Sequence, residues 1–415
     1  MKINGKRLEN NIETLSLFGK DKEGGIYRSI GSSSDLEARK WLCEQFEKLG
    51  AEIRIDAMAN IFATMKGKED ILPLAIGSHH DAVPNGGKYD GAMGVLLALE
   101  VMNTLCEEKI QLRHPYQAIL FTAEEPNPFG ISTMGSRSIT GKIKYDLLKK
   151  SKNSENGMLL STAIKNAGGN IDNLECDQMK KNQLSAFIEC HIEQSRNLEN
   201  NNLPLGVVST ITGIYREKIT IKGEANHSGT TSMTNRKDAL TASSELILNI
   251  ESIAKDYQKT EIVSTVGNLN VYPNAANIIP DKVNLIMEIR TPDESYKNDF
   301  IKKIDNVIYD IENRRGVIIK REVNLNQSGV KMDSKIIEVL EKHVKTEQDK
   351  SIKLVSMAGH DAVHMTDITK VGMLFVRSKD GKSHCKEEYT KPQDIEKAGN
   401  TLINTLIELD KTLDI

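Results

Sequence analysis

The sequence has few cysteines, and it contains no long apolar run. Its five cysteines are scattered along 415 residues, and no Cys-x-x-Cys pair occurs among them. Neither a disulfide framework nor a cysteine zinc site is therefore indicated. No stretch reaches the roughly 18 apolar residues that a transmembrane helix needs, and the polar residues 1–6 are unlike a signal peptide. We expect a cytoplasmic protein with no membrane partner.

Aromatic residues are also scarce, and neither sign of charge is in large excess. Aromatics make up 5% of the chain, and the formal net charge is −3. Nucleic-acid binding usually depends on positive charge and on stacking side chains, so we expect no nucleic-acid partner. What is present is an ordinary globular composition, 39% hydrophobic and 27% charged. The length suggests two or three domains.

The first half of the chain alternates helical and strand patterns. Nearly continuous apolar runs at residues 72–78, 118–123 and 185–190 are typical of strands that are buried on both faces. A helical pattern spans residues 92–105. This alternation predicts an α/β layer architecture with a mostly parallel sheet.

The middle of the chain has a different pattern. Strand and helix patterns alternate there as β-α-β-β-α-β, at residues 214–221, 238–254, 261–271, 282–290, 296–311 and 317–323. This order is ferredoxin-like. We therefore predict an α+β domain at residues 212–328, inserted into a discontinuous catalytic domain formed by residues 1–211 and 329–415.

Histidine and carboxylate residues follow several of the predicted strands. His79 directly follows the first apolar run, and Asp81, two residues later on an extended segment, shares its face. Asp81 can therefore hold one ring nitrogen of His79 while the other nitrogen binds a metal. Asp90 precedes the predicted helix, where an ordinary helix N-cap is the alternative interpretation.

Three further segments extend this pattern. Glu124 and Glu125 follow the second apolar run, His191 directly follows the third, and His384 follows a later apolar run at residues 373–376. Each segment alone could be an ordinary polar loop. Together, histidines and carboxylates at several strand ends of one sheet predict a site for zinc, or for manganese and similar ions. In a two-metal hydrolytic site, Asp90 could bridge the ions and Glu124 could act as the free base.

These motifs resemble those of the dinuclear metallopeptidase and aminoacylase superfamily, and they are most similar to its amidase and carbamoylase branch. That branch includes N-carbamoyl-L-amino-acid hydrolases, allantoate amidohydrolases and ureidoglycolate amidohydrolases. The resemblance runs from about Ser32 to the C-terminus. It implies a phosphorylase/hydrolase-like three-layer αβα catalytic domain, with an inserted ferredoxin-like domain that serves as lid and dimerisation domain.

The resemblance also implies roles for individual residues. Two divalent ions are expected, zinc or manganese and possibly cobalt or nickel. Glu124 is the implied general base, and Asp81 is the second catalytic residue of this centre. His191, within His-Ile-Glu-Gln, stands where the peptidases of the superfamily carry an acidic ligand, which favours the carbamoylase branch. The implied metal ligands are His79, Asp90, Glu125, His191 and His384.

Implied substrate residues lie mainly in and after the inserted domain. His227 resembles the histidine that reaches the partner's active site in a homodimer and polarises the scissile carbonyl. Arg290 would bind a substrate carboxylate, although an ordinary charge at a sheet edge is the alternative. Asn277 could likewise be only a turn residue before Pro280. The implied substrate-binding set is Gln194, His227, Asn277, Arg290, Gly359 and His360.

The motifs conflict over the exact substrate. The segment after Glu125 is more like that of ureidoglycolate enzymes, residues 359–361 are more like allantoate enzymes, and residues 375–378 are more like carbamoylases. We expect hydrolysis of the C–N bond of a ureido group in a small carboxylate, as in N-carbamoyl-L-amino-acid hydrolases. The alternatives are an allantoate or ureidoglycolate amidohydrolase, an aminoacylase or exopeptidase, and a non-catalytic metal-bound binding protein. A nucleotide-dependent enzyme is disfavoured because no phosphate loop occurs.

Overall fold

The chain forms two compact units. The computed structural model describes residues 1–257 and 262–413. The first unit comprises Met1–Ser209, Met332–Leu354 and Gly359–Ile415, and the second comprises Thr210–Lys331 and Val355–Ala358. The insertion predicted at residues 212–328 falls within the second unit.

A nine-stranded sheet contains the strands that lead to the candidate site. Its strands are β2 (Glu52–Ile55), β3 (Ile61–Met65), β4 (Leu74–His79), β6 (Tyr116–Phe121), β7 (Ala186–Ile192), β8 (Leu205–Ile211), β13 (Val330–Lys331), β14 (Lys353–Ser356) and β15 (Val371–Val376). They follow the order β13-β8-β15-β7-β4-β6-β3-β2, and β14 also pairs with β8. The neighbours β15, β7, β4 and β6 run parallel. The pairs β2·β3, β3·β6, β8·β15 and β13·β8 are antiparallel.

The prediction of a mostly parallel sheet is thus correct only for the centre. The strands β4, β7 and β15 are buried at every residue, as expected for strands that are covered on both faces. An apolar run indicates that a strand is buried, but it does not indicate the direction of that strand relative to its neighbours. The sequence pattern therefore could not show that the flanking strands are antiparallel.

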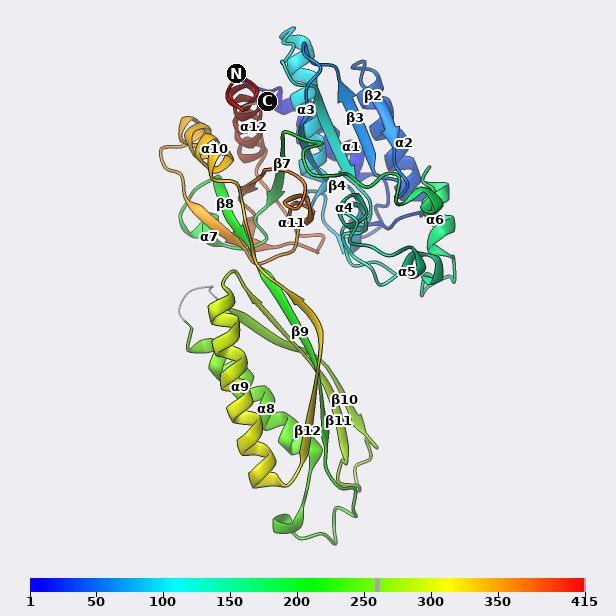
Figure 1. Cartoon of the computed structure of the whole chain (residues 1–415), viewed down its shortest axis with the longest axis vertical. Helices are drawn as coiled ribbons and strands as arrows, with labels where there is room; N and C mark the ends of the chain where they lie inside the picture. Colours follow the sequence, from blue (N-terminus) through cyan, green and yellow to red (C-terminus); the bar gives the residue numbers. More distant parts are fainter. Residues whose placement is uncertain (258–261, 414–415) are drawn as a thin grey trace. The chain divides into compact units, whose positions relative to one another are not determined.

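Helices cover both faces of this sheet, which gives three layers (Figure 1). The largest apolar core joins one face to α1 (Gly5–Ser16), α2 (Ser33–Glu47), α3 (Ala92–Glu107), α10 (Ser334–Glu347) and α12 (Pro392–Thr412). Two short helices also contact strands of this sheet. α11 (Ala362–Met365) contacts β7 and β15, and α4 (Met134–Ile139) contacts β6. Alternate residues of β7, such as Ile188 and Cys190, face the large core. Glu189 and His191 therefore lie on the opposite face.

Short elements complete the first unit. β1 (Ile26–Arg28) and β5 (Ala82–Gly86) form a separate antiparallel pair. The remaining short helices are α5 (Tyr145–Lys150), α6 (Leu160–Asn166), η1 (Ile171–Asn173), α7 (Asn197–Asn200) and η3 (Lys379–Gly381). Within residues 1–257 and 262–413, none of the helices combines the length and the apolar character that crossing a bilayer requires.

The second unit is a four-stranded antiparallel sheet with two long helices. Its strands are β9 (Gly213–Lys222), β10 (Val263–Tyr272), β11 (Lys282–Thr291) and β12 (Ile318–Gln327). The strand order is β10-β11-β9-β12, and every pair is antiparallel. Glu261, with which the second of these strands was predicted to begin, lies outside the described residues.

Two helices cover one face of that sheet. α8 (Ala239–Lys255) and α9 (Glu294–Arg315) contact each other and share one apolar core with the strands (Figure 1). Burial alternates along β11, as expected when only one face is covered. A short helix, η2 (Met233–Asn235), precedes α8. The chain order β-α-β-β-α-β is the predicted ferredoxin-like one.

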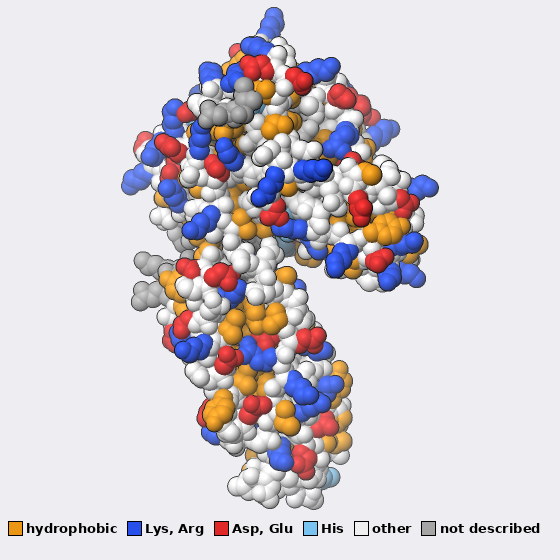
Figure 2. Space-filling view, viewed as in Figure 1, with side chains coloured by type: hydrophobic (Ala, Val, Ile, Leu, Met, Phe, Trp, Pro, Cys, Tyr) orange, Lys and Arg blue, Asp and Glu red, His pale blue; other side chains and the backbone are white. Residues whose placement is uncertain are grey.

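The surface carries both signs of charge. On the face drawn in Figure 2, acidic and basic side chains are interspersed over each unit. This pattern agrees with the small net charge of the chain.

Candidate metal and catalytic centre

The candidate ligands of the first unit lie where the parallel strands end. His79 is the last residue of β4, and His191 is the next-to-last residue of β7. Glu124 and Glu125 come shortly after β6 ends at Phe121. In α/β sheets, the carboxyl ends of parallel strands meet at the edge where ligands bind. This topology brings together residues that are far apart in the sequence.

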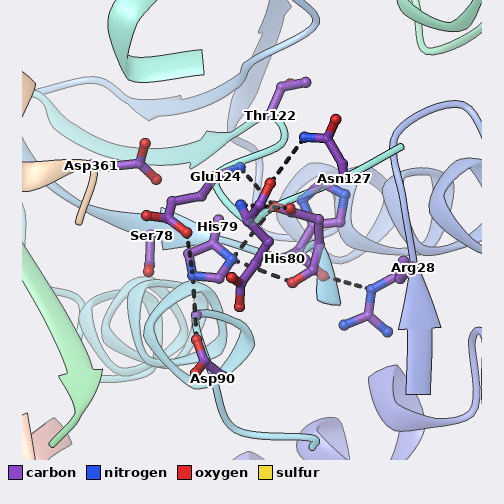
Figure 3. Close-up of polar contacts among 12 residues, drawn as sticks. Arg28, Ser78, His79, His80, Asp90, Thr122, Glu124, Asn127 and Asp361 are labelled. Carbon is purple, nitrogen blue, oxygen red and sulfur yellow. Dashed lines mark hydrogen bonds and ion pairs between the residues drawn. The ribbon is translucent and has the colours of Figure 1, made fainter. Parts of the chain in front are cut away.

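His79 is held between carboxylates. Its Nδ1 lies 3.4 Å from Asp81 Oδ1 and 3.3 Å from the Asp81 carbonyl oxygen. Its Nε2 lies 3.5 Å from Asp90 Oδ1 and 3.8 Å from Glu124 Oε2. Figure 3 shows Glu124 and Asp90 on either side of the ring. Asp81 therefore orients the imidazole, and Nε2 is left facing the cluster as a ligand atom.

Asp81 also fixes the loop that carries the two glutamates. Its Oδ1 accepts a hydrogen bond from the Glu124 amide at 3.2 Å, and its Oδ2 accepts one from the Glu125 amide at 3.1 Å. One buried carboxylate thus positions both His79 and the Glu124–Glu125 pair.

His191 faces the same cluster. Its Nδ1 lies 3.0 Å from its neighbour's carbonyl, Ile192 O, which leaves Nε2 as the acceptor. That Nε2 lies 3.1 Å from Asp90 Oδ1. Gly91 lies against this group with φ of 61°, and a side chain there would come within 2.3 Å of the His79 ring. Only glycine fits a position of this conformation and closeness.

Asp90 lies between the candidate ligands His191 and His384. It does not cap α3, because Gly91 occupies the N-cap position and no side chain caps the helix. The N-cap interpretation of Asp90 is therefore wrong. Besides the histidines, Asp90 Oδ2 accepts hydrogen bonds from Gln194 Nε2, at 2.7 Å, and from the Ser383 hydroxyl.

Glu125 and His384 form the other side of the cluster. His384 Nε2 lies 3.0 Å from Glu125 Oε1 and 3.6 Å from Asp90 Oδ2. The side chain of His384 is 45% exposed, whereas that of Glu125 is 5% exposed. The centre is therefore open to solvent on the His384 side.

The electrostatics show an excess of buried negative charge. Burial raises the pKa of Glu124 well above its usual value, and the nearby carboxylates of Glu125 and Asp361 raise it further. Burial alone would lower the pKa of His79, but the surrounding carboxylates raise it well above the usual range. The hydrogen bond to Glu125 raises the pKa of His384 to about 9. Such shifts mark a site that favours added positive charge.

The donor set fits divalent metal ions. Three groups each place their ligand atoms within 4.8 Å of one another: His79, Asp90 and His191; Asp90, Glu125 and His384; and His79, Glu124 and Glu125. The first two groups share only Asp90. This is the arrangement expected for two ions bridged by one carboxylate.

The comparisons with known proteins agree with this chemistry. The sequence matches the model of Peptidase family M20/M25/M40 over residues 75–408. The chain belongs to this family. An N-carbamoyl-L-amino-acid amidohydrolase of Pseudomonas sp. (strain NS671) is 34% identical to it, over 98% of this chain and 98% of that protein. A ureidoglycolate hydrolase of Arabidopsis thaliana is also 34% identical, over 99% of this chain and 87% of that protein.

A solved structure matches equally fully. The crystal structure of an amidase of the hydantoinase/carbamoylase family from Burkholderia multivorans superposes with a TM-score of 0.88 at 27% identity, over 98% of both chains. The predicted family, α/β fold and hydrolytic activity are thereby confirmed. This M20 family member is a hydrolytic enzyme.

Besides Gln194, which binds Asp90, two further predicted substrate residues lie in the first unit. His360 is buried, and its ring contacts the ring of His191 edge-on at a centroid distance of 4.6 Å. Gly359 precedes it, and a side chain there would meet no atom within 4 Å. His360 thus packs against a candidate ligand of this hydrolase.

Three other predicted residues belong to the second unit. His227 and Asn277 are exposed, and Asn277 lies in a turn. Arg290 lies on β11. Its Nε donates a hydrogen bond to Glu288 Oε1, and its Nη1 donates one to the Met357 carbonyl. Since β11 is flanked by β10 and β9, Arg290 is not at the sheet edge. The sheet-edge interpretation of Arg290 is wrong.

Sequence reasoning missed the buried residues that support the centre. Glu388 Oε1 accepts hydrogen bonds from the backbone amides of Tyr89 and Asp90 at 2.8 and 3.0 Å, and so holds the backbone at Asp90 in place. Arg28, fully buried, donates from Nε to the His80 carbonyl at 2.6 Å, between His79 and Asp81 (Figure 3). Neither residue belongs to a sequence pattern that would have singled it out.

A buried ion network lies behind the same loop. Asp35 Oδ1 accepts from Arg39 Nε at 2.9 Å and lies 2.9 Å from His80 Nε2. Burial opposes the charge on Asp35, but Arg39 and His80 lower its pKa to about 2. Asp35 belongs to none of the sequence motifs described above. Its buried role depends on the tertiary fold.

Proposed function

We propose that this protein hydrolyses the C–N bond of a ureido group in a small carboxylate substrate, as an N-carbamoyl-L-amino-acid amidohydrolase does. The observation that carries the proposal is the sharing of Asp90 by two ligand groups, with Glu124 beside them. Glu124 shares a ligand group with His79, and it belongs to neither of the two groups that contain Asp90. A relative that is 34% identical over nearly the whole chain bears that activity in its name.

The proposed cofactor is a pair of divalent ions, zinc or manganese and possibly cobalt or nickel. The ligands are His79, Asp90, Glu125, His191 and His384. Bound ions of this kind acidify water and polarise a carbonyl group. Imidazole and carboxylate ligands in this mixture suit zinc and manganese alike, so the donor set supports the class of metal and not one element.

Glu124 is proposed as the general base, with Asp81 as the residue that orients it. The Glu124 carboxylate takes a proton from the attacking water and later passes it to the departing nitrogen. Asp81 holds the Glu124 amide and the His79 ring at the same time, so the base and the ligand keep a fixed geometry.

Gln194, Gly359 and His360 are proposed as the substrate-binding residues of the first unit. Gln194 Nε2 binds Asp90, while its Oε1 has no hydrogen-bond partner among residues 1–257 and 262–413. A buried carbonyl oxygen without a partner is costly. A ureido N–H group of the substrate would supply the missing donor.

His227, Asn277 and Arg290 are the proposed substrate residues of the second unit. Arg290 would bind the substrate carboxylate through Nη2, because the two hydrogen bonds described above use Nε and Nη1 of its guanidinium. His227 would donate a hydrogen bond to the developing oxyanion in the partner subunit of a homodimer that forms through the second unit. We also propose that the enzyme works in the cytoplasm, where its five free cysteines would stay reduced.

Other activities on the same scaffold differ in their products. The second candidate substrate is ureidoglycolate, favoured by the Arabidopsis relative, and allantoate is a third ureido acid to consider. An aminoacylase or exopeptidase would use the same ligands. A metal-bound binding protein without catalysis would have no need of a base, so Glu124 disfavours it.

The test is a substrate panel with the metal-reconstituted protein. We expect ammonia release from N-carbamoyl-L-amino acids and less or none from allantoate and ureidoglycolate. N-acetyl amino acids and dipeptides, followed by amine release, serve as the comparison set. Turnover of the comparison set alone would replace the proposal with an aminoacylase or peptidase. If no compound of the panel is hydrolysed while two metals are bound, the proposed ureido substrate is wrong and the enzyme acts on another class of compound.

A further inference from the structure

The loop that carries His227 is closed at its base. The Glu224 amide donates to the Lys237 carbonyl at 2.9 Å, and the two side chains form an ion pair at 3.4 Å. Gly223 allows this closure, because a side chain there would come within 1.9 Å of the Lys237 carbonyl oxygen. Residues 224–237 therefore form a compact surface loop with adjacent ends.

Within this loop, one backbone amide fixes the imidazole of His227. The Gly229 N–H donates to His227 Nδ1 at 3.1 Å. An imidazole nitrogen that accepts a hydrogen bond carries no proton, so the proton of the neutral ring resides on Nε2. The exposed edge of the ring thus presents an N–H donor. That is the form needed to stabilise an oxyanion.

The backbone of His227 is also held in place. Its carbonyl accepts hydrogen bonds from the Thr231 hydroxyl at 2.9 Å and from the Thr231 amide at 3.2 Å. Its amide donates to Asn226 Oδ1 at 2.8 Å. The Ser228 amide donates to the Asn277 carbonyl at 3.0 Å, which ties the turn to a second segment.

Arg236 joins the two sides of this turn. Its Nη2 donates to the carbonyls of Ser228 and Thr231, and its Nε donates to Thr231 O at 3.3 Å. These two carbonyls flank Gly229, whose amide binds the His227 ring. A planar guanidinium can serve several acceptors in fixed directions, which a lysine ammonium cannot do in the same way.

We propose that Arg236 is a positioning residue for His227: it clamps the turn at residues 228–231 so that the Gly229 amide holds the His227 ring in the tautomer with the proton on Nε2. The inference rests on the proposed function for the role of His227 in turnover. The state of the ring itself does not depend on that function. Arg236 acts through the loop and need not touch the substrate.

The first experiment measures kcat and KM for Arg236→Ala, Arg236→Lys and a matched control, Arg314→Ala. Arg314 lies on α9 of the same unit and forms ion pairs with Glu245 and Asp310. We expect Arg236→Ala to lower kcat by roughly tenfold to a hundredfold, because small displacements of a catalytic donor have effects of that size. KM should change little, Arg236→Lys should recover part of kcat, and Arg314→Ala should match the wild type.

The second experiment determines which ring nitrogen of His227 carries the proton. It uses long-range ¹H–¹⁵N spectra of histidine-labelled protein without substrate. His227→Gln assigns the signals among the nine histidines. We expect Nδ1 to resonate as an unprotonated nitrogen in the wild type. Tautomers should mix in Arg236→Ala and also in Gly229→Pro, which lacks the amide proton, while the control Arg314→Ala keeps the wild-type pattern.

The two readouts separate this inference from the proposed function. A protonated Nδ1 in the wild type, or an unchanged tautomer in Arg236→Ala, would contradict the proposed role of Arg236, whatever the measured kcat. If no panel compound is hydrolysed, or if His227→Gln retains full kcat, the proposed function fails in that respect. The spectra would still decide whether Arg236 fixes the ring.

Discussion

The two units hold their proposed chemical groups in opposite ways. In the first unit, His79, Asp90, Glu125 and His191 are almost fully buried, at the ends of strands that are themselves buried. In the second unit, His227 is exposed on a surface loop. The first set is held by side chains that contact one another, and the second is held mainly by backbone hydrogen bonds.

This contrast shows what each site requires. Buried carboxylates raise one another's pKa values, as at Glu124, and such a cluster is costly unless cations balance it. A solvated histidine has no comparable electrostatic cost, but it must be oriented. The buried site therefore depends on metal ions for its charge balance, whereas the loop depends on clamps such as Arg236 for its geometry.

The largest effect should come from removing a ligand of the buried set. His79→Ala should reduce the metal content from about two ions to about one or fewer per chain, and turnover should become undetectable. Metal analysis after dialysis, together with the ammonia assay, measures both. His343→Ala is the matched control, since His343 pairs with Glu408 on the surface of α10 and α12. Equal metal content in the two variants would remove His79 from the site.

The next largest effect is expected at the base. Glu124→Gln should lower kcat by about 10³-fold, the size typical of a lost general base, with the metal content unchanged. Glu69→Gln, which alters an exposed partner of Arg113, should leave kcat as it is. If Glu124→Gln lost the metals as well, Glu124 would be a ligand, and the sharp distinction between base and ligand would disappear.

A smaller effect, on stability, should come from the buried support at Asp35. The folded-state pKa of Asp35 is about 2, below its usual value of 3.8. A depressed carboxyl pKa stabilises the fold above the unfolded value, and that contribution is lost as pH falls from about 4 through about 2. The lost stabilisation is about 2 kcal/mol. Denaturant unfolding of the wild type and Asp35→Asn should therefore differ most above pH 4.

The stability difference also tests whether the support is electrostatic. The gap between the two proteins should narrow steadily as the pH is lowered below about 4, since protonated Asp35 resembles Asn. A gap that stays constant down to the lowest pH at which the wild type folds would show that Asp35 contributes packing and not charge.

The sequence predicted the parts of the fold that depend on local pattern. Buried runs located β4, β6 and β7 within one or two residues, and the β-α-β-β-α-β order of the second unit followed from periodicity. The helix α1 was not predicted, although Leu8, Ile12 and Leu15 recur at helical spacing within residues 5–16 and are buried. The antiparallel flanks of the main sheet were beyond reach, since strand direction depends on long-range pairing.

By itself, the sequence determined which residue types stand at the ends of the apolar strands and before the helix at residues 92–105, and this was enough to nominate His79, Glu125 and Asp90. Only the tertiary structure decided that Asp90 belongs to two ligand groups at once, and that Glu388 and Arg28 hold the site from behind. The reason is physical. A ligand type can be read from one position, but a charge-balanced cluster exists only where distant segments meet, and burial then sets the pKa of every group within it.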